Sequence, residues 1–299
     1  MHIQSQSIGL LIETITHKLI GHFTPPEEHA WWIIEAITGK KRAHLIAKHN
    51  ISLTPEQHAQ LEHWLHALIY EHMPLQYLIG SVPFGDLDIL VEPPTLIPRP
   101  ETEEWCLDLI NQLQKAEIKK LTILDMCTGS GCIALALAQA LPKATIYATD
   151  ISNKALELAK KNAIHNKISN VTFLHSDLFD SISDLFKFDI IVANPPYIDQ
   201  KEWETLAASV SEWEDKKALI APENGLAIIE EILKIAPQYL KENKELKQHA
   251  IPQILIEIGH QQGISVHALM MNYRYNSISI KKDLAHKDRV ACGRVHGLV

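Results

Sequence analysis

The sequence predicts an α/β protein: a parallel sheet covered by helices on both sides, preceded by a small helical bundle. From about residue 100, short apolar runs of strand type alternate with helical patterns, which is typical of βαβ units. Before residue 74, the apolar residues keep helical spacing throughout. We therefore expect a helical domain at residues 1–74, a β-hairpin linker at 75–99 and an α/β domain at 100–299.

The N-terminal part repeats one pattern, an apolar stripe at helical spacing. Such stripes are formed by Ile8, Leu11, Ile12, Ile15 and Leu19, and again by Leu61, Trp64, Leu65, Leu68 and Ile69. Pro25-Pro26 and Thr54-Pro55 predict new helix starts, with Thr24 and Thr54 as caps. A bundle this small is either a structural lid or a docking surface for a partner. Proline and β-type residues beyond it predict the hairpin linker.

A glycine turn joins the first strand of the α/β part to a helix. The apolar run at 121–124 is followed by Asp125-Met126-Cys127-Thr128-Gly129-Ser130-Gly131 and then by a helical pattern from Cys132. Glycines let a ligand approach the backbone closely, and the start of the helix offers free N–H groups. The turn, with Asp125 before it, therefore predicts a nucleotide-cofactor site.

Two acidic residues extend this site. The strand at 144–149 ends in Asp150, about 20 residues beyond the turn, where an acid can accept hydrogen bonds from both hydroxyls of a ribose. After a third strand at 171–174, Asp177 can meet the amino group of an adenine and Leu178 its face. Ala134 breaks the dinucleotide pattern and no Gly-Lys-Ser/Thr is present, so a pyrophosphate is not expected. The cofactor that fits is S-adenosylmethionine, which contains adenosine without phosphates.

The tetrapeptide Asn194-Pro195-Pro196-Tyr197 follows an apolar strand at 188–193. The side-chain oxygen of Asn194 and the carbonyl of Pro195 are two acceptors that together can hold an NH2 group. The ring of Tyr197 offers a face to a planar group such as an amide or a base. The alternative is a strand followed by a rigid turn, since asparagine and proline are common turn residues. Together with the cofactor site, the tetrapeptide favours methyl transfer to a planar nitrogen.

Further strands are expected at 253–258 and 275–280, whereas the cysteines and histidines predict no metal site. The four cysteines show no metal-binding spacing and are expected to be reduced and structural. A row of histidines along one helical stretch is explained by a solvated face, since no acid or cysteine cluster accompanies it. This row comprises His58, His63, His66 and His72.

The composition agrees with an enzyme of two domains. The chain has 299 residues, of which 46% are hydrophobic, and its 28 basic and 36 acidic residues give a net charge of −8. A nucleic-acid binder is more often basic, so no direct nucleic-acid partner is expected. No apolar run is long enough to cross a membrane, and neither a signal peptide nor an Arg-rich transit peptide is evident. We expect a cytoplasmic protein without a membrane partner.

The chain resembles the HemK-type (PrmC) family of protein-glutamine N5-methyltransferases, which modify peptide-chain release factors. The resemblance runs from Pro74 to the C-terminus and rests on the glycine turn, Asp150, Asp177 and Asn-Pro-Pro-Tyr. Four further segments contribute, at 74–80, 96–103, 257–263 and 283–290, and the second of these, with Ile-Pro-Arg-Pro-Glu-Thr-Glu, is the most specific. The resemblance implies a Rossmann-like class I S-adenosylmethionine-dependent methyltransferase domain and release factors as substrates. It also favours the docking role of the helical domain.

The resemblance implies roles for particular residues. It places catalysis at Asn194, Pro195, Pro196 and Tyr197, and cofactor binding at Asp125, Cys127, Thr128, Gly129, Ser130, Gly131, Asp150, Asp177, Leu178 and Asn194. Arg99 and Glu101 are candidates for shaping the substrate entrance, with an exposed ion pair as the alternative.

Two positions depart from the family pattern. Cys127 stands where glycine is common, and its Cβ is expected to be tolerated. The loop at 218–225 lacks the phenylalanine and the further glycines that the family usually has before the corresponding acidic-Gly pair, so a different shape is expected there. Two other functions are considered: a nucleic-acid adenine N6-methyltransferase, and a protein that only binds a cofactor or partner.

Overall fold

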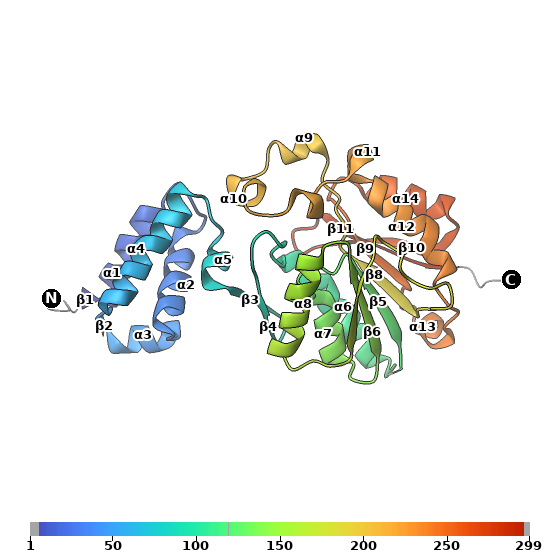
Figure 1. Ribbon diagram of the computed structural model, residues 1–299, viewed down its shortest axis with the longest axis horizontal. Coiled ribbons are helices and arrows are strands. Elements are labelled where there is room, and N and C mark those ends of the chain that lie inside the picture. The colour runs from blue at the N-terminus through green and yellow to red at the C-terminus, as the bar shows by residue number, and fades with distance from the viewer. Residues whose placement is uncertain (1–5, 119, 296–299) are drawn as a thin grey trace. The chain divides into compact units, whose positions relative to one another are not determined.

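The computed structural model describes residues 6–118 and 120–295, which form two compact units (Figure 1). The first unit comprises residues 6–80 together with 208–213, and the second contains the remaining described residues. Residues 75–79, expected in the hairpin linker, instead form a helix, and Leu75 is buried in the core of the first unit. No helix among the described residues has the length and apolar character needed to cross a bilayer.

The first unit is a helical bundle with a small strand pair. Its elements are β1 (Gln6–Ser7), α1 (Ile8–Leu19), α2 (Pro26–Thr38), α3 (Arg42–Lys48), β2 (Asn50–Ile51), α4 (Pro55–Tyr70), α5 (Leu75–Ile79) and the short helix α10 (Ala208–Ser211). The two apolar stripes predicted from the sequence lie in its core, together with the apolar residues of α2. The strands β1 and β2 pair antiparallel, so the expectation of helices alone was wrong. Two-residue strands are too short to show an alternating pattern.

One of the two predicted helix caps is present. The Thr54 hydroxyl accepts from Gln57 N at 3.2 Å, and the Gln57 side chain accepts from Thr54 N at 3.0 Å, which completes a capping box. Helix α2, however, begins after Pro25 without a side-chain cap, so the prediction for Thr24 was wrong. Trp213, from the 208–213 segment, donates its indole N–H to the carbonyl of Glu71 at 2.8 Å.

The second unit contains a hairpin followed by an α/β sheet. Its strands are β3 (Ser81–Phe84), β4 (Leu87–Leu90), β5 (Thr122–Met126), β6 (Thr145–Asp150), β7 (Val171–His175), β8 (Ile190–Ala193), β9 (Ile254–Glu257), β10 (Tyr275–Lys282) and β11 (Asp288–Val295). Its longer helices are α6 (Pro100–Lys115), α7 (Cys132–Ala140), α8 (Asn153–His165), α12 (Ala227–Ile235) and α14 (Gly263–Asn272). The short helices are α9 (Gln200–Trp203), η1 (Lys216–Ala218), α11 (Pro222–Gly225), η2 (Ala236–Gln238) and α13 (Lys244–Gln248).

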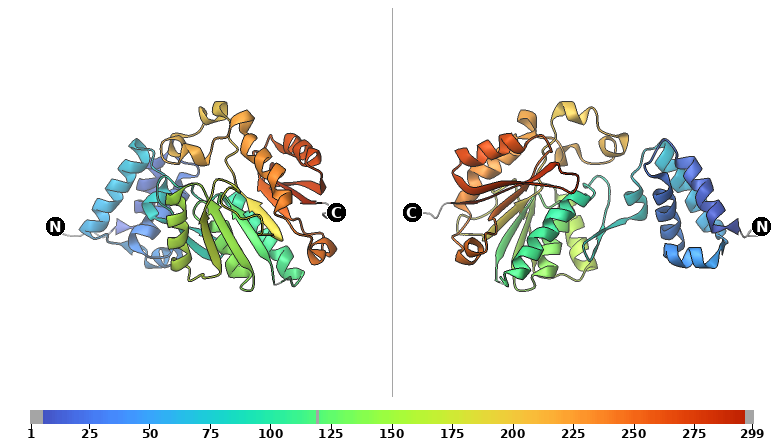
Figure 2. Two further views of the ribbon diagram at one scale, coloured as in Figure 1. Left: turned by 45° about the vertical axis from the view of Figure 1, so that its right-hand side comes forward. Right: turned by 180° about the vertical axis from the view of Figure 1, so that it is seen from behind.

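The main sheet has the strand order β10-β11-β9-β8-β5-β6-β7. Neighbouring strands from β9 to β7 are parallel, and β11 runs antiparallel between β9 and β10. The expected sheet was parallel, and β11 is the exception because the short turn from β10 permits only an antiparallel partner. Helices α6, α7 and α8 cover one face, and α12 and α14 cover the other (Figure 1; Figure 2).

Candidate functional site

The order of the strands places the predicted site at the carboxyl ends of β5 and β8. The chain runs from β5 outward to β6 and β7 and then returns to β8 on the other side of β5, which is a topological switch point. Met126 at the end of β5 pairs with Ala193 at the end of β8, and Ala193 pairs with Ile256 of β9. The glycine turn, Asn194 and Glu257, which come directly after these residues, therefore lie along the same edge of the sheet. Ligands of open α/β sheets bind in the crevice at such an edge.

The glycine turn combines close packing with an open surface. Cys127, Gly129 and Gly131 have φ values of 58°, 56° and 84°. A Cβ on Gly131 would lie 3.0 Å from the Cβ of Ala159, so this glycine lets helix α8 approach the turn. A Cβ on Gly129 would meet no atom within 4 Å, which leaves this side of the turn open to a ligand. Cys127 adopts the left-handed conformation without being glycine, and it packs partly against the core.

Asp125 holds the turn from inside. Its Oδ2 accepts hydrogen bonds from Thr128 Oγ1 at 2.5 Å and from Ala134 N at 3.1 Å. Burial raises the pKa of Asp125 to about 7, although both hydrogen bonds act in the opposite direction. Its Oδ1 has no hydrogen-bond partner among the described residues. The Ser130 carbonyl accepts from the side chain of Asn162 at 3.0 Å, so the far end of the turn is fixed as well.

Asp150 lies beside the turn, as the spacing predicted. Its Oδ2 accepts from Gly129 N at 2.9 Å and its Oδ1 from Ser152 N at 2.8 Å. Burial raises the pKa of Asp150, and the two backbone N–H groups oppose this effect. Each carboxylate oxygen keeps further acceptor capacity. A fixed carboxylate next to an open glycine turn fits a ribose with two hydroxyls.

Asp177 and Leu178 lie directly beyond β7. Asp177 is exposed, whereas Leu178 is partly buried against the core and has a φ of 43°. Ser176 holds this bend, since its hydroxyl donates to the Leu178 carbonyl at 2.8 Å. An exposed carboxylate beside an apolar side chain matches the chemistry predicted for an adenine contact. The residues present therefore fit a cofactor that contains adenosine.

Asn194 is anchored by one end of its amide. Its Nδ2 donates to Thr102 Oγ1 at 3.3 Å. Within residues 6–118 and 120–295, neither Asn194 Oδ1 nor the Pro195 carbonyl oxygen accepts a hydrogen bond. The two acceptors predicted from the tetrapeptide thus remain available for a substrate nitrogen.

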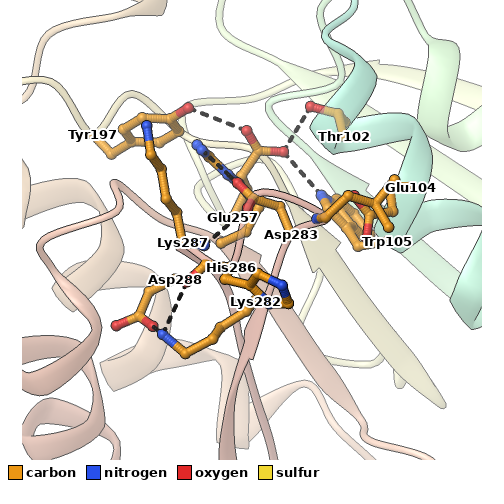
Figure 3. A network of polar contacts seen from close by, with 12 residues as sticks. Thr102, Glu104, Trp105, Tyr197, Glu257, Lys282, Asp283, His286, Lys287 and Asp288 are labelled. Atoms are coloured by element: carbon orange, nitrogen blue, oxygen red, sulfur yellow. Dashed lines mark hydrogen bonds and ion pairs between the residues drawn. The ribbon is translucent and has the colours of Figure 1, made fainter.

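Tyr197 is held at both its side chain and its backbone. Its hydroxyl donates to Glu257 Oε1 at 3.1 Å (Figure 3), and its carbonyl accepts from Gln262 Nε2 at 2.9 Å. Gln262 is itself oriented, because Gly259 N donates to its Oε1 at 2.8 Å. A Cβ on Gly225 would lie 1.9 Å from the Tyr197 carbonyl oxygen, so only glycine fits here. The tetrapeptide is rigidly supported.

The loop before Gly225 has an unusual backbone conformation, and the entrance candidate Arg99 forms a largely buried ion pair. Glu223 and Asn224 have φ values of 57° and 56°, so this loop reaches left-handed conformations without glycine. Arg99 Nη2 lies 2.6 Å from Glu214 Oε2, and the Glu214 side chain is 1% exposed while that of Arg99 is 31% exposed. Arg99 therefore pairs with Glu214 rather than with Glu101. Burial raises the pKa of Glu214, and the adjacent guanidinium opposes the shift.

Three residues beside the site were assigned no role by the sequence reasoning. These are Thr102, Glu257 and Gln262, each of which contacts the tetrapeptide or a side chain that does. All three lay within segments on which the resemblance rests. The signal for Glu257 was present in the sequence, since an acid interrupts the apolar run of β9. A buried carboxylate needs donors, and this need marks it as part of a polar network.

Comparison with known proteins identifies the class. Residues 107–213 match the model of the methyltransferase small domain, and residues 11–80 match that of the PrmC N-terminal domain. A methyltransferase from Pyrococcus furiosus shares the fold with a TM-score of 0.50 and 15% identity over 82% of this chain and all of that one. The hMettl16 catalytic domain, solved in complex with an RNA hairpin, has a TM-score of 0.52 and 15% sequence identity. The match covers 81% of this chain and 82% of that one. The second unit has the fold of class I methyltransferases.

Relatives in sequence show to which methyltransferase family the chain belongs. The release factor glutamine methyltransferase of Flavobacterium psychrophilum is 35% identical over 88% of this chain and 90% of its own length. Its counterpart in Salmonella typhimurium is 38% identical over 90% of this chain and 92% of its own length. The enzyme of Lactococcus lactis is 40% identical over 74% of this chain and 77% of its own length. The chain belongs to the release factor glutamine methyltransferase family. The resemblance seen in the sequence is thereby confirmed.

Proposed function

We propose that this protein transfers the methyl group of S-adenosylmethionine to the side-chain amide nitrogen (N5) of the glutamine in the Gly-Gly-Gln motif of peptide-chain release factors. The observation that carries the proposal is the pair of free acceptors, Asn194 Oδ1 and the Pro195 carbonyl, at the switch point beside the glycine turn. The names of the relatives support the same substrate.

The cofactor is proposed to lie against the glycine turn, with its ribose on Asp150 and its adenine near Asp177 and Leu178. When bound, it supplies a methyl group on a positively charged sulfur. Gly129 leaves room for this approach, and Asp150 is already fixed by two backbone N–H groups. The cofactor side of the site is therefore preorganised.

The substrate amide is proposed to donate its two N–H groups to Asn194 Oδ1 and to the Pro195 carbonyl. An amide nitrogen is a weak nucleophile because its lone pair is delocalised into the carbonyl. Two fixed acceptors can direct that lone pair toward the methyl group and favour loss of planarity. Tyr197 offers its ring to the plane of the amide. Positioning then supplies most of the rate.

Neither ionisable group beside the tetrapeptide suits the role of a strong base. Burial raises the pKa of Tyr197, which keeps the hydroxyl protonated. Burial raises the pKa of Glu257, but its three hydrogen-bond donors oppose this effect and hold the carboxylate in place. The proton released after transfer is proposed to leave to water.

The first unit, residues 6–80 with 208–213, is proposed to dock the protein substrate. Because the proposed substrates are translation factors, we place the protein in the cytoplasm. The competing function, adenine N6-methylation, would use the same acceptors for an exocyclic amino group, but the relatives favour glutamine. The net charge of −8 also disfavours a nucleic-acid substrate.

The test is transfer of a labelled methyl group from S-adenosylmethionine to purified release factor. The same factor carrying Gln→Ala in its Gly-Gly-Gln loop and a duplex DNA serve as controls. The proposal predicts label on the intact factor alone. Label on DNA, or equal label on the Gln→Ala factor, would overturn it.

A further inference from the structure

A buried carboxylate at the end of β9 organises the substrate side of the site. Glu257 is 1% exposed, and its Oε2 accepts hydrogen bonds from Thr102 Oγ1 at 2.7 Å and Trp105 Nε1 at 2.9 Å. Its Oε1 accepts from the Tyr197 hydroxyl at 3.1 Å (Figure 3). Three donors, two from helix α6 and one from the tetrapeptide, thus converge on one side chain. A buried polar group with this many partners fixes the orientation of each of them.

The direction of each hydrogen bond follows from the chemistry of the donors. An indole N–H can only donate, so the contact with Trp105 makes Glu257 Oε2 an acceptor. As a carboxylate, Glu257 has no hydrogen to donate, so Thr102 gives its single hydroxyl hydrogen to this oxygen as well. With no hydrogen left, Thr102 Oγ1 can only accept from Asn194, whose Nδ2 lies 3.3 Å away. The amide of Asn194 is thereby turned so that Nδ2 faces Thr102 and Oδ1 faces away.

We propose that Thr102 and Glu257 are positioning residues for methyl transfer, which hold Asn194 with its oxygen, rather than its NH2 group, presented to the substrate amide. This inference rests on the proposed function and adds the contacts that set the orientation of the Asn194 amide. If the Asn194 amide were reversed, its NH2 group would face the NH2 group of the substrate, and two donors would meet. Glu257 has a second role, since its other oxygen holds the Tyr197 ring.

The test compares Thr102→Val with Thr102→Ser in the release-factor assay. Valine keeps the shape and removes the hydroxyl, so kcat is expected to fall by about 3–10-fold, the range of one net hydrogen bond. The KM for the factor and the cofactor Kd are expected to stay within about twofold, because neither ligand touches Thr102 in the proposed arrangement. Serine is expected to recover most of the loss in kcat.

Trp105→Phe provides a matched control for stability. It removes another donor to the same Glu257 oxygen and leaves the bond between Thr102 and Asn194 intact. Its kcat is expected to stay within about twofold of the wild type even if its melting temperature falls. If Thr102→Val does not fold, Thr102→Ala is used in its place.

A double-mutant cycle separates orientation from mere packing. In Asn194→Asp both side-chain oxygens are acceptors, so there is no amide left to orient. Adding Thr102→Val to that background is expected to lower kcat by less than about twofold. The same loss in both backgrounds, or a serine variant as slow as the valine variant, would overturn the proposal. An inactive wild type would instead refute the proposed function, so the two failures are distinguishable.

Discussion

Replacement of Asp125 by asparagine should remove a pH dependence of stability that the buried carboxyl creates. In the folded protein, burial raises the pKa of Asp125 from its ordinary value of 3.8 to about 7. Between these two values the folded chain binds a proton that the unfolded chain has released. The contribution of Asp125 to stability is therefore fully present below pH 3.8 and is lost as the pH rises through 7.

The size of the effect follows from the shift. The whole difference in pKa corresponds to about 4 kcal/mol, of which about 1.4 kcal/mol is lost between pH 6 and pH 8. Asparagine can keep an oxygen toward Thr128 and Ala134 N, and its NH2 group would take the place of the unpartnered Oδ1. The turn should thus survive while the titration disappears.

The assay is urea unfolding of wild type and Asp125→Asn at pH 6, 7 and 8, followed by tryptophan fluorescence. The wild type should lose about 1.4 kcal/mol more unfolding free energy across this range than the variant. Asp108→Asn, at a half-exposed aspartate of α6, controls for loss of a charge. Equal pH slopes in wild type and Asp125→Asn would show that Asp125 does not titrate in this range.

Three further substitutions test other supports of the site. Gly225→Ala should lower kcat at least about tenfold, because its Cβ would collide with the Tyr197 carbonyl oxygen; unchanged kinetics would contradict this. Asp150→Asn should raise the cofactor Kd at least about tenfold in calorimetry, since an NH2 group would face a backbone N–H; an unaltered Kd would argue against the ribose contact. Glu214→Gln should leave the free energy of unfolding at about pH 7 unchanged or raise it slightly, because burial outweighs the ion pair with Arg99 and raises the pKa of Glu214; a lower midpoint in urea would contradict this.

Those parts of the site that are marked by residues adjacent in the sequence were predictable. The glycine turn, Asp150 and the tetrapeptide each end a strand whose apolar run is visible locally, and the parallel sheet brings those ends together. The antiparallel β11 was missed as an element, and the strand pair β1–β2 is too short to leave a pattern.

The supports of the site depend on the three-dimensional fold. Asn194 and Thr102 are 92 residues apart in the chain, and Thr102 and Glu257 are 155 apart. Their contact depends on how the first turns of helix α6 pack against the carboxyl ends of β8 and β9, which no local spacing encodes. The partner of Arg99 was hidden for the same reason, since Glu214 lies 115 residues further along the chain. Local patterns thus predicted which groups lie at this edge of the sheet, but not which groups orient them.

The most direct measurement is single-turnover methyl transfer to intact release factor by wild type and by Asn194→Ala, with cofactor affinity measured on both. The variant is expected to bind S-adenosylmethionine as the wild type does and to transfer the methyl group at least about 10²-fold more slowly, the size of effect seen when one fixed hydrogen-bond group is removed from a transition state. Transfer at the wild-type rate by a variant that still binds the cofactor would contradict the claim that Asn194 positions the amide.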